Sequence, residues 1–136
     1  MVKCEIRADN NGNKFYSLNK KLHREGGPAV EYANGIKEWY KNGQLHREDG
    51  PAVEHLDGEK QWWLHGKRHR EDGPACEYAN GDRLWFIDGS LHREDGPAIE
   101  WCDGYKSWYL NNKCYGYSDD YTCNSWIKFV KTLIFS

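Results

Sequence analysis

The sequence predicts a mainly β protein, a repeat array of antiparallel β-hairpins that forms a twisted or coiled meander, with a C-terminal capping helix. Three observations support this prediction. The chain of 136 residues repeats one pattern at a fixed period, which is set by His23, His46, His69 and His92. Each repeat contains an Asn-Gly or Asp-Gly turn signal. The runs between turns are short and rich in aromatic side chains, which favours strands over helices.

Four repeats can be aligned without gaps, and the same nine positions are identical in all four. Each repeat begins with a His-Arg-Glu-x-Gly-Pro-Ala segment. The repeats cover residues 22–44, 45–67, 68–90 and 91–113. Residues 4–21 resemble a degenerate half-repeat, and residues 114–136, which depart from the period, are expected to form the helical cap. We expect the whole chain, 1–136, to form a single domain.

The first turn of each repeat, Asn34-Gly35 in the first, is expected to be a two-residue type I′ loop. A second turn follows at Asn42-Gly43. The two-residue loop would place Tyr32 opposite Lys37, as a cross-strand contact between a ring and a basic side chain, and Val30 opposite Trp39.

This register assigns the side chains of each hairpin to two faces. One face would carry the valine position and the tryptophan, and we expect it to be the core. Its structural tryptophans are Trp39, Trp62, Trp85 and Trp108. Trp62 and Trp85 should be buried, and Trp108 should be buried only if the helix covers it. The other face would carry alanine, glutamate and a second aromatic residue, and it should be wetter.

The C-terminal segment predicts a helix from about Asn124 to Ile134. Trp126, Ile127 and Val130 recur there at helical spacing, and Ser118-Asp119-Asp120 offers an N-cap and first-turn acidity. A helix that covers the last strand edge is favoured over one that anchors the chain to a membrane.

The composition excludes several classes of partner and cofactor. The net charge is −2 with no basic block, so neither nucleic acid nor a membrane is expected to bind. The five cysteines contain no C-x-x-C pair, which favours a reduced, cytoplasmic protein. No phosphate-binding loop, nucleophile elbow or zinc-protease motif is present, so we expect no catalytic residue, no cofactor and no metal.

The stretch EYANGIKEWYKNGQLHREDG, from residue 31, resembles a MORN repeat, the hairpin module built around Y-x-G-x-W-x-x-G-K-x-H-G-x-G. The resemblance covers roughly residues 4–113. The His-Arg-Glu-Asp-Gly-Pro-Ala variant is similar to divergent repeats of uncharacterised bacteriophage and giant-virus proteins, and to variant repeats of antitoxin components. The resemblance implies an elongated β-sheet that binds partners. It also implies a viral protein, which would work in the host cytoplasm.

The His-Arg-Glu-Asp segment has two interpretations. In the functional interpretation, each copy presents a general base, an anion clamp and a carboxylate. In the structural interpretation, the rings of His46, His69 and His92 pack on the sheet and form hydrogen bonds with the backbone of the bend. The arginines pair with carboxylates. A fold repeated four times needs four structural contacts, whereas an active site needs one constellation, so we favour the structural interpretation.

The favoured function is a non-enzymatic binding module that inhibits a host or cognate protein through the wetter, aromatic-rich face. Large aromatic side chains and arginines are enriched at interface hot spots. The candidate binding residues are Tyr40, Trp63, Phe86, Tyr109, Glu54, Glu77, Arg47, Arg70 and Arg93. The alternatives are a sponge for a small anionic, nucleotide-like ligand and an antitoxin or immunity-type protein. The protein is expected to be a monomer or a homodimer.

Overall fold

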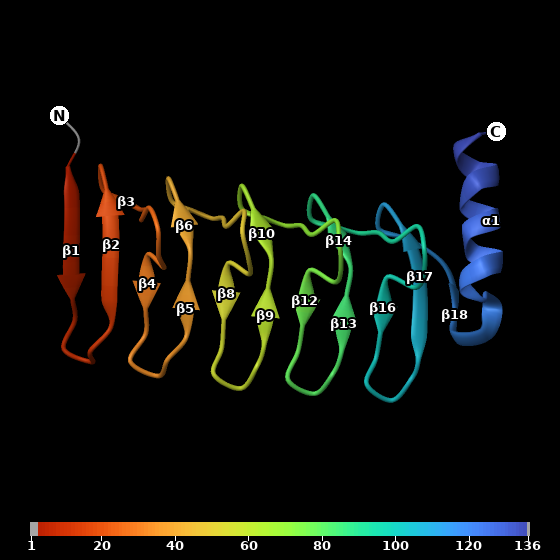
Figure 1. Cartoon of the computed structure of the whole chain (residues 1–136), viewed down its shortest axis with the longest axis horizontal. Helices are drawn as coiled ribbons and strands as arrows, with labels where there is room; N and C mark the ends of the chain where they lie inside the picture. The colour runs from red at the N-terminus through yellow and green to blue at the C-terminus, as the bar shows by residue number, and fades with distance from the viewer. Residues whose placement is uncertain (1–2, 136) are drawn as a thin grey trace. The chain divides into compact units, whose positions relative to one another are not determined.

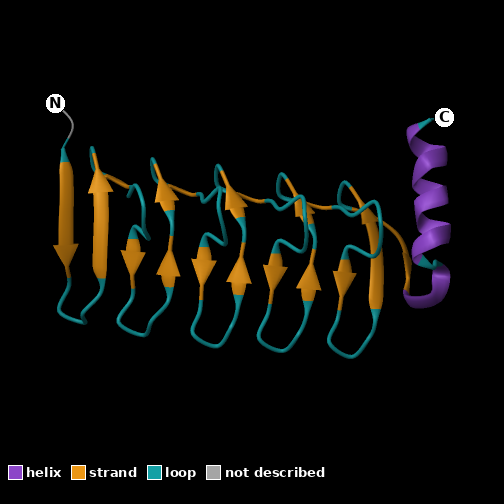
Figure 2. Ribbon diagram, in the orientation of Figure 1, coloured by secondary structure: helices purple, strands orange, loops and turns teal. Residues whose placement is uncertain are grey.

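The computed structural model describes residues 3–135, which divide into two compact units on either side of the Arg68–His69 bond. Each unit consists of antiparallel hairpins, and the described part of the chain has one α-helix, near the C-terminus (Figure 1; Figure 2). This confirms the predicted fold class.

The first unit contains a sheet with the spatial order β1-β2-β4-β5-β8-β9; β3 also pairs with β2. Two further hairpins, β6–β7 and β10–β11, stand apart from this sheet. The strands are β1 (Cys4–Ala8), β2 (Lys14–Leu18), β3 (Lys21–Leu22), β4 (Val30–Glu31), β5 (Lys37–Glu38), β6 (Tyr40–Lys41), β7 (Gln44–Leu45), β8 (Val53–Glu54), β9 (Lys60–Gln61), β10 (Trp63–Leu64) and β11 (Lys67–Arg68).

The second unit repeats this plan with the order β12-β13-β16-β17-β18 and a separate hairpin, β14–β15. Its elements are β12 (Cys76–Glu77), β13 (Arg83–Leu84), β14 (Phe86–Ile87), β15 (Ser90–Leu91), β16 (Ile99–Glu100), β17 (Lys106–Leu110), β18 (Lys113–Tyr117), the 3₁₀ turn η1 (Ser118–Asp120) and the helix α1 (Cys123–Ile134).

The first hairpin of each repeat closes with a three-residue loop, not the predicted two-residue loop. In the first repeat, Val30 lies opposite Glu38 and Glu31 opposite Lys37, and the Tyr32 amide donates to the Ile36 carbonyl at 2.9 Å. Gly35 takes the left-handed conformation with φ +91°. This is a type I turn followed by a glycine bulge. The predicted pairing of Tyr32 with Lys37 is therefore wrong by one residue.

The two-residue type I′ loops occur instead in the second hairpin of each repeat. Asn42 and Gly43 have φ values of 51° and 81°, and Tyr40 lies opposite Leu45. Figure 1 shows β6 in line with β5, so the first hairpin leads directly into the second. The equivalent loops are His65-Gly66, Asp88-Gly89 and Asn111-Asn112, all with positive φ.

The observed register also changes which side chains share a face, because a shift of one residue moves one strand's side chains to the opposite face. Trp39 lies with Ala29 and Glu31, whereas Tyr40 lies with Val30. We call these the tryptophan face and the valine face. The prediction that tryptophan and valine share one face is wrong.

The core is narrow and is filled mainly by small side chains. Fully or almost fully buried residues are Ala29, Ala52, Ala75, Ala98, Val30, Val53, Cys76 and Ile99. Trp39, Trp62 and Trp85 are only half-buried, so the predicted burial of Trp62 and Trp85 is wrong. The reason is visible at Trp85, where the outer ring face is covered by a guanidinium group and not by an apolar layer.

Trp108, in contrast, is buried because α1 covers it. Trp126 of the helix lies 5.4 Å from the Trp108 ring, and Val130 packs in the same cluster with Leu110. The helix begins one residue before the predicted start, with Thr122 as N-cap, while the predicted N-cap residues form η1. Among residues 3–135 there is no helix with the length and apolar character that crossing a membrane requires.

Candidate functional site

The His-Arg-Glu-x-Gly-Pro segment near the start of each repeat forms a loop around its arginine. We call these loops the clip loops (residues 23–28, 46–51, 69–74 and 92–97). In the second clip loop the Arg47 guanidinium lies 4.0 Å above the Trp39 ring of the preceding repeat. Its Nη1 donates to the Pro51 carbonyl at 3.0 Å and to Glu54 at 3.2 Å, and its Nε donates to Asp49 at 3.0 Å. One side chain therefore joins the loop to a ring and a strand.

The other clip loops repeat this geometry. Arg24 lies 3.9 Å above Tyr16, and Arg93 lies 3.9 Å above Trp85. Arg70 bonds the Pro74 carbonyl and Glu77 as Arg47 bonds its own partners. These contacts are those of the structural interpretation, in which the arginines pair with carboxylates.

The glycine before each proline is required for space and not for its backbone angle. A Cβ added at Gly50 would lie 3.0 Å from Arg47 Cζ, and one at Gly96 would lie 2.6 Å from Arg93 Cζ. Neither glycine has a positive φ. The guanidinium group fills the volume that any larger residue would need.

Each clip-loop histidine accepts a backbone amide on its ring nitrogen Nδ1. His46 Nδ1 accepts the backbone N–H of His65 at 2.9 Å, and His92 Nδ1 accepts that of Asn111 at 3.1 Å. Because Nδ1 is an acceptor, the proton is on Nε2, which points at the Glu48 carboxylate 3.4 Å away. His23 and His69 make the same amide contact. Each ring fixes the second turn of its repeat, which occupies the nitrogen that a general base would use.

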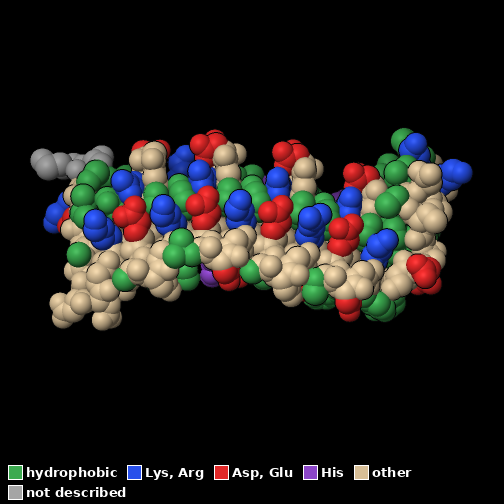
Figure 3. Space-filling view, turned by 60° about the horizontal axis from the view of Figure 1, so that its bottom comes forward, with side chains coloured by type: hydrophobic (Ala, Val, Ile, Leu, Met, Phe, Trp, Pro, Cys, Tyr) green, Lys and Arg blue, Asp and Glu red, His purple; other side chains and the backbone are tan. Residues whose placement is uncertain are grey.

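A row of alternating charges crosses the tryptophan face of each unit. In the first unit, cross-strand pairs join Lys14, Glu31, Lys37, Glu54 and Lys60 in that order. In the second unit, the row is Glu77, Arg83, Glu100 and Lys106. Figure 3 shows the rows as alternating blue and red side chains. Opposite charges that face each other across strands stabilise the register.

The predicted aromatic binding residues lie apart from these charges. Tyr40 and Trp63 are on the valine face, where their polar atoms bond Glu38 at 3.0 Å and Gln61 at 3.1 Å. Phe86 is buried, and Tyr109 is half-buried. The side chains of Tyr40, Trp63, Phe86 and Tyr109 therefore lie on the opposite face from those of Glu54, Glu77 and the three arginines. The backbones meet nevertheless, because the amides of Arg47, Arg70 and Arg93 donate to the carbonyls of Trp63, Phe86 and Tyr109 at 3.0, 3.1 and 3.2 Å.

The Tyr40 phenol is strongly affected by its surroundings. Burial first, and then the negative charge and hydrogen bond of Glu38, raise the pKa of Tyr40 to about 12. The same causes raise the pKa of Tyr32. The two phenols therefore act as hydrogen-bond donors to one carboxylate, a structural role.

Grooves separate successive clip loops on the tryptophan face. One, of about 360 Å³, lies in the first unit between residues 24–27 and 46–49, with Trp39 and Lys41 also in its lining. The equivalent groove of the second unit, about 670 Å³, lies between residues 70–73 and 92–95 and includes Trp85. The side chains at the rims are exposed carboxylates; Glu71 and Asp72 are 83% and 88% exposed.

Sequence reasoning missed these rim carboxylates as binding candidates. The sequence pattern that could have indicated them is the Glu-Asp pair, which recurs in three of the four repeats. Neither side chain is apolar, so packing in the core does not explain the recurrence. In the structure, the arginine Nε holds the aspartate, at 3.0 Å for Asp72 and 2.8 Å for Asp95. The carboxylates are therefore presented at fixed positions.

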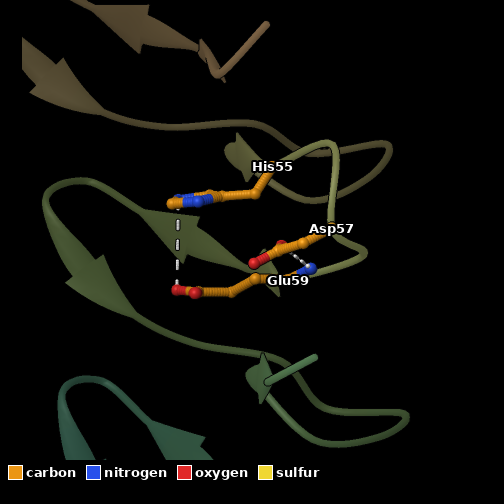
Figure 4. Close-up of side chains that lie close together, drawn as sticks. All are labelled: His55, Asp57 and Glu59. Carbon is orange, nitrogen blue, oxygen red and sulfur yellow. Dashed lines mark hydrogen bonds and ion pairs between the residues drawn. The ribbon is translucent and has the colours of Figure 1, made fainter. Parts of the chain in front are cut away.

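A cluster of three ligating side chains occurs in the loop of the second repeat (Figure 4). One ligand atom from each of His55, Asp57 and Glu59 lies within 4.8 Å of the others. Asp57 Oδ1 accepts the Glu59 amide at 3.0 Å, and Glu59 Oε1 accepts Gln61 Nε2 at 2.8 Å. His55 and Glu59 are 4.0 Å apart. The hairpin's own hydrogen bonds account for the positions of both carboxylates.

Comparison of the chain with models of known protein families gives no match, and no curated protein sequence matches it.

Proposed function

We propose that the protein is a non-enzymatic binding module whose partner is another protein, bound in the grooves between clip loops. The observation that carries this proposal is a groove between acidic rims that occurs in both units. The groove of the second unit has a Glu-Asp pair on each rim, whereas one rim of the first-unit groove has Glu25 followed by Gly26, and Lys41 also lines that groove. The partner would contribute a basic, extended segment. An inhibitor of a host or cognate protein and an antitoxin are two forms of this function.

The charge that a groove offers is negative. The Nε and Nη1 donors of Arg70 and Arg93 are engaged by a carbonyl and an aspartate of their own clip loops and by a glutamate of the strand that follows. Glu94 and Asp95 remain 57% and 77% exposed. Lysine or arginine side chains of a partner would therefore meet accessible carboxylate oxygens, with charge-assisted hydrogen bonds as the main interaction.

The spacing of the grooves favours one conformation of the segment. Successive clip loops within a unit are two strands apart, roughly 10 Å. A polyproline II segment rises about 3.1 Å per residue with three residues per turn, so every third side chain points the same way about 9 Å apart. A segment with a basic residue at every third position thus matches the rims.

Two alternative functions have less support. A nucleotide-like ligand would need an open ring and a cation, but the Trp39 and Trp85 rings are covered by guanidinium groups, and the rims repel phosphate. An enzyme would need a free base, and the clip-loop histidines bond backbone amides.

The test uses fluorescence anisotropy with labelled peptides of defined sequence. A peptide with arginine at every third position, separated by prolines, should bind at least about tenfold tighter than a peptide of the same composition with its arginines in one block. Added salt should weaken binding, since the contacts are between exposed charges. Equal affinity for both peptides would contradict the spacing, and no binding of either would contradict the proposal.

Matched variants locate the binding site. Glu71→Gln and Glu94→Gln remove rim charges but keep an oxygen that can accept from His69 or His92, so they should weaken binding with unchanged thermal stability. Asp103→Asn removes an exposed charge outside the grooves, at a position where Asn34 and Asn80 stand in other repeats. An equal loss with Asp103→Asn would show that only net charge matters. Binding of ATP that Trp85→Phe abolishes would favour the small-ligand alternative.

A further inference from the structure

We infer that β1 is a self-complementary edge through which two copies of this chain pair, strand against strand, about a twofold axis at Ile6. The inference concerns the end of the first unit and is independent of the grooves. Among the described residues, β1 pairs only with β2. All five of its residues are exposed, and Ile6 is 72% exposed.

The backbone of β1 turns its even-numbered residues towards the open edge. On the β2 side, the Lys3 carbonyl accepts from the Asn19 amide at 2.9 Å, and the Asp9 amide donates to the Asn13 carbonyl at 3.0 Å. Backbone groups alternate between the two edges of a strand. The N–H and C=O groups of Cys4, Ile6 and Ala8 therefore point outward.

The pairing of Tyr16 supports this assignment independently. Tyr16 lies opposite Ile6, and it uses its amide on the Ala29 carbonyl and its carbonyl on the His23 amide. Both groups face away from β1. Tyr16 and Ile6 thus form a non-hydrogen-bonded pair, which leaves the Ile6 backbone free for a second strand.

Charge then selects the register of the pair. With outward groups at even positions, antiparallel self-pairing has three central registers, with the twofold axis at residue 5, 6 or 7. An axis at Glu5 opposes two glutamates, and an axis at Arg7 opposes two arginines. An axis at Ile6 opposes each Glu5 to Arg7 of the other copy, twice per dimer. Facing opposite charges stabilise a strand pair and like charges destabilise it.

The same register places apolar groups together. Ile6 would face Ile6 of the second copy in a hydrogen-bonded pair, with Cys4 opposite Ala8 on either side. The contact buries the exposed Ile6 side chain and satisfies an open sheet edge, which proteins otherwise protect. A closed, isologous dimer follows, since the edge is used up on both copies.

The test measures mass by light scattering across a concentration series, with the fold checked by circular dichroism. The native chain should reach twice the 16.0 kDa of one chain at high concentration. Arg7→Glu, and separately Glu5→Arg, should each weaken self-association at least about tenfold, because every dimer then contains two like-charge pairs. The two variants mixed in equal amounts should form a heterodimer, and the double charge swap should restore the homodimer.

A second variant removes the central hydrogen bonds without disturbing β2. Ile6→Pro deletes an amide that points outward, a position where proline is tolerated on edge strands. It should give a folded monomer. A native chain that keeps the mass of one copy at all concentrations would overturn the inference. A dimer that persists in Ile6→Pro and in both single charge variants would place the contact elsewhere and overturn it equally.

Discussion

The clip-loop arginine combines stacking, hydrogen bonding and volume in one side chain. Arg93 covers Trp85, bonds Pro97, Asp95 and Glu100, and occupies the space beside Gly96. Lysine could not replace it, because a single ammonium group lacks both the planar face and the divergent donors. The fixed glycine and the fixed arginine are thus two parts of one packing arrangement.

Replacement of Gly96 should therefore be costly only while Arg93 is present. Gly96→Ala puts a Cβ 2.6 Å from Arg93 Cζ, and we expect a loss of about 1–3 kcal/mol from overpacking. Urea unfolding of the two single variants and the double variant Arg93→Ala/Gly96→Ala measures the coupling. In the double variant the alanine should add almost no further loss. Strict additivity would show that Gly96 is needed for another reason.

Tyr40 contributes stability to the first unit that is lost at high pH. Its pKa is raised from 10.0 to about 12 by burial and by Glu38, so the folded state holds the phenol proton more tightly than the unfolded state. The contribution is complete below about pH 10 and is lost as the pH rises towards 12. Ultraviolet titration of the phenolate should show a late-ionising tyrosine that is absent in Tyr40→Phe. Glu38→Gln should lower the pKa of Tyr40; an unchanged late titration in Tyr40→Phe would contradict the assignment.

At the scale of the hairpin, the sequence predicted the positions of the turns correctly, but it did not predict the pairing register of the strands. Asn34-Gly35 fits either a two-residue or a three-residue loop, since Gly35 has positive φ in both. The Asn34 side chain decides between them, because its Oδ1 accepts the Ile36 amide at 3.1 Å. A longer-range signal was available: every repeat has a glutamate and a basic residue, such as Glu31 and Lys37, that face each other only in the observed register.

The predicted positive φ of Gly58 and Gly81 is confirmed, at 99° for both. A Cβ at Gly58 would contact nothing within 4 Å, so a substitution there tests the backbone angle alone. Gly58→Val should destabilise the first unit by about 1–2 kcal/mol. Chemical unfolding of Gly58→Val and of the native chain measures this. Equal stability of Gly58→Val and the native chain would show that the loop accepts another conformation.

At the scale of the whole molecule, the apolar core is distributed unevenly. In the repeats it consists of alanine and valine positions, whereas the end of the second unit holds a cluster of large rings. Trp108, Trp126, Tyr115, Tyr121 and Phe129 contact one another there. The sequence predicted a covering helix but not that its tryptophan would donate to a clip-loop carbonyl, that of Arg93, at 2.9 Å. That contact joins two residues that are far apart in the sequence, which no local pattern reveals.

This distribution of the core predicts which tryptophan contributes more to the free energy of unfolding. Trp108 is 1% exposed, whereas Trp85 is half-buried beneath a charged group. Trp108→Ala should cost about 3–5 kcal/mol, and Trp85→Ala clearly less. Both changes lie in the second unit, so thermal unfolding of the two variants is a matched comparison. A larger loss at Trp85 would show that the guanidinium stack, and not burial by the helix, dominates.

The arginine stacks also give the array a direction. Within the first unit, Arg47 of the second repeat covers Trp39 of the first, and within the second unit, Arg93 of the fourth repeat covers Trp85 of the third, so in each unit a repeat covers the ring of the repeat before it. Within a unit, each repeat therefore presents the same kind of ring surface to the repeat that follows it. Gly116 stands one period after Arg93, where the next arginine would be, and Trp126 covers Trp108 in its place. The helix thus acts as a terminator, and duplication of one repeat upstream of it would lengthen the array without requiring a new kind of junction.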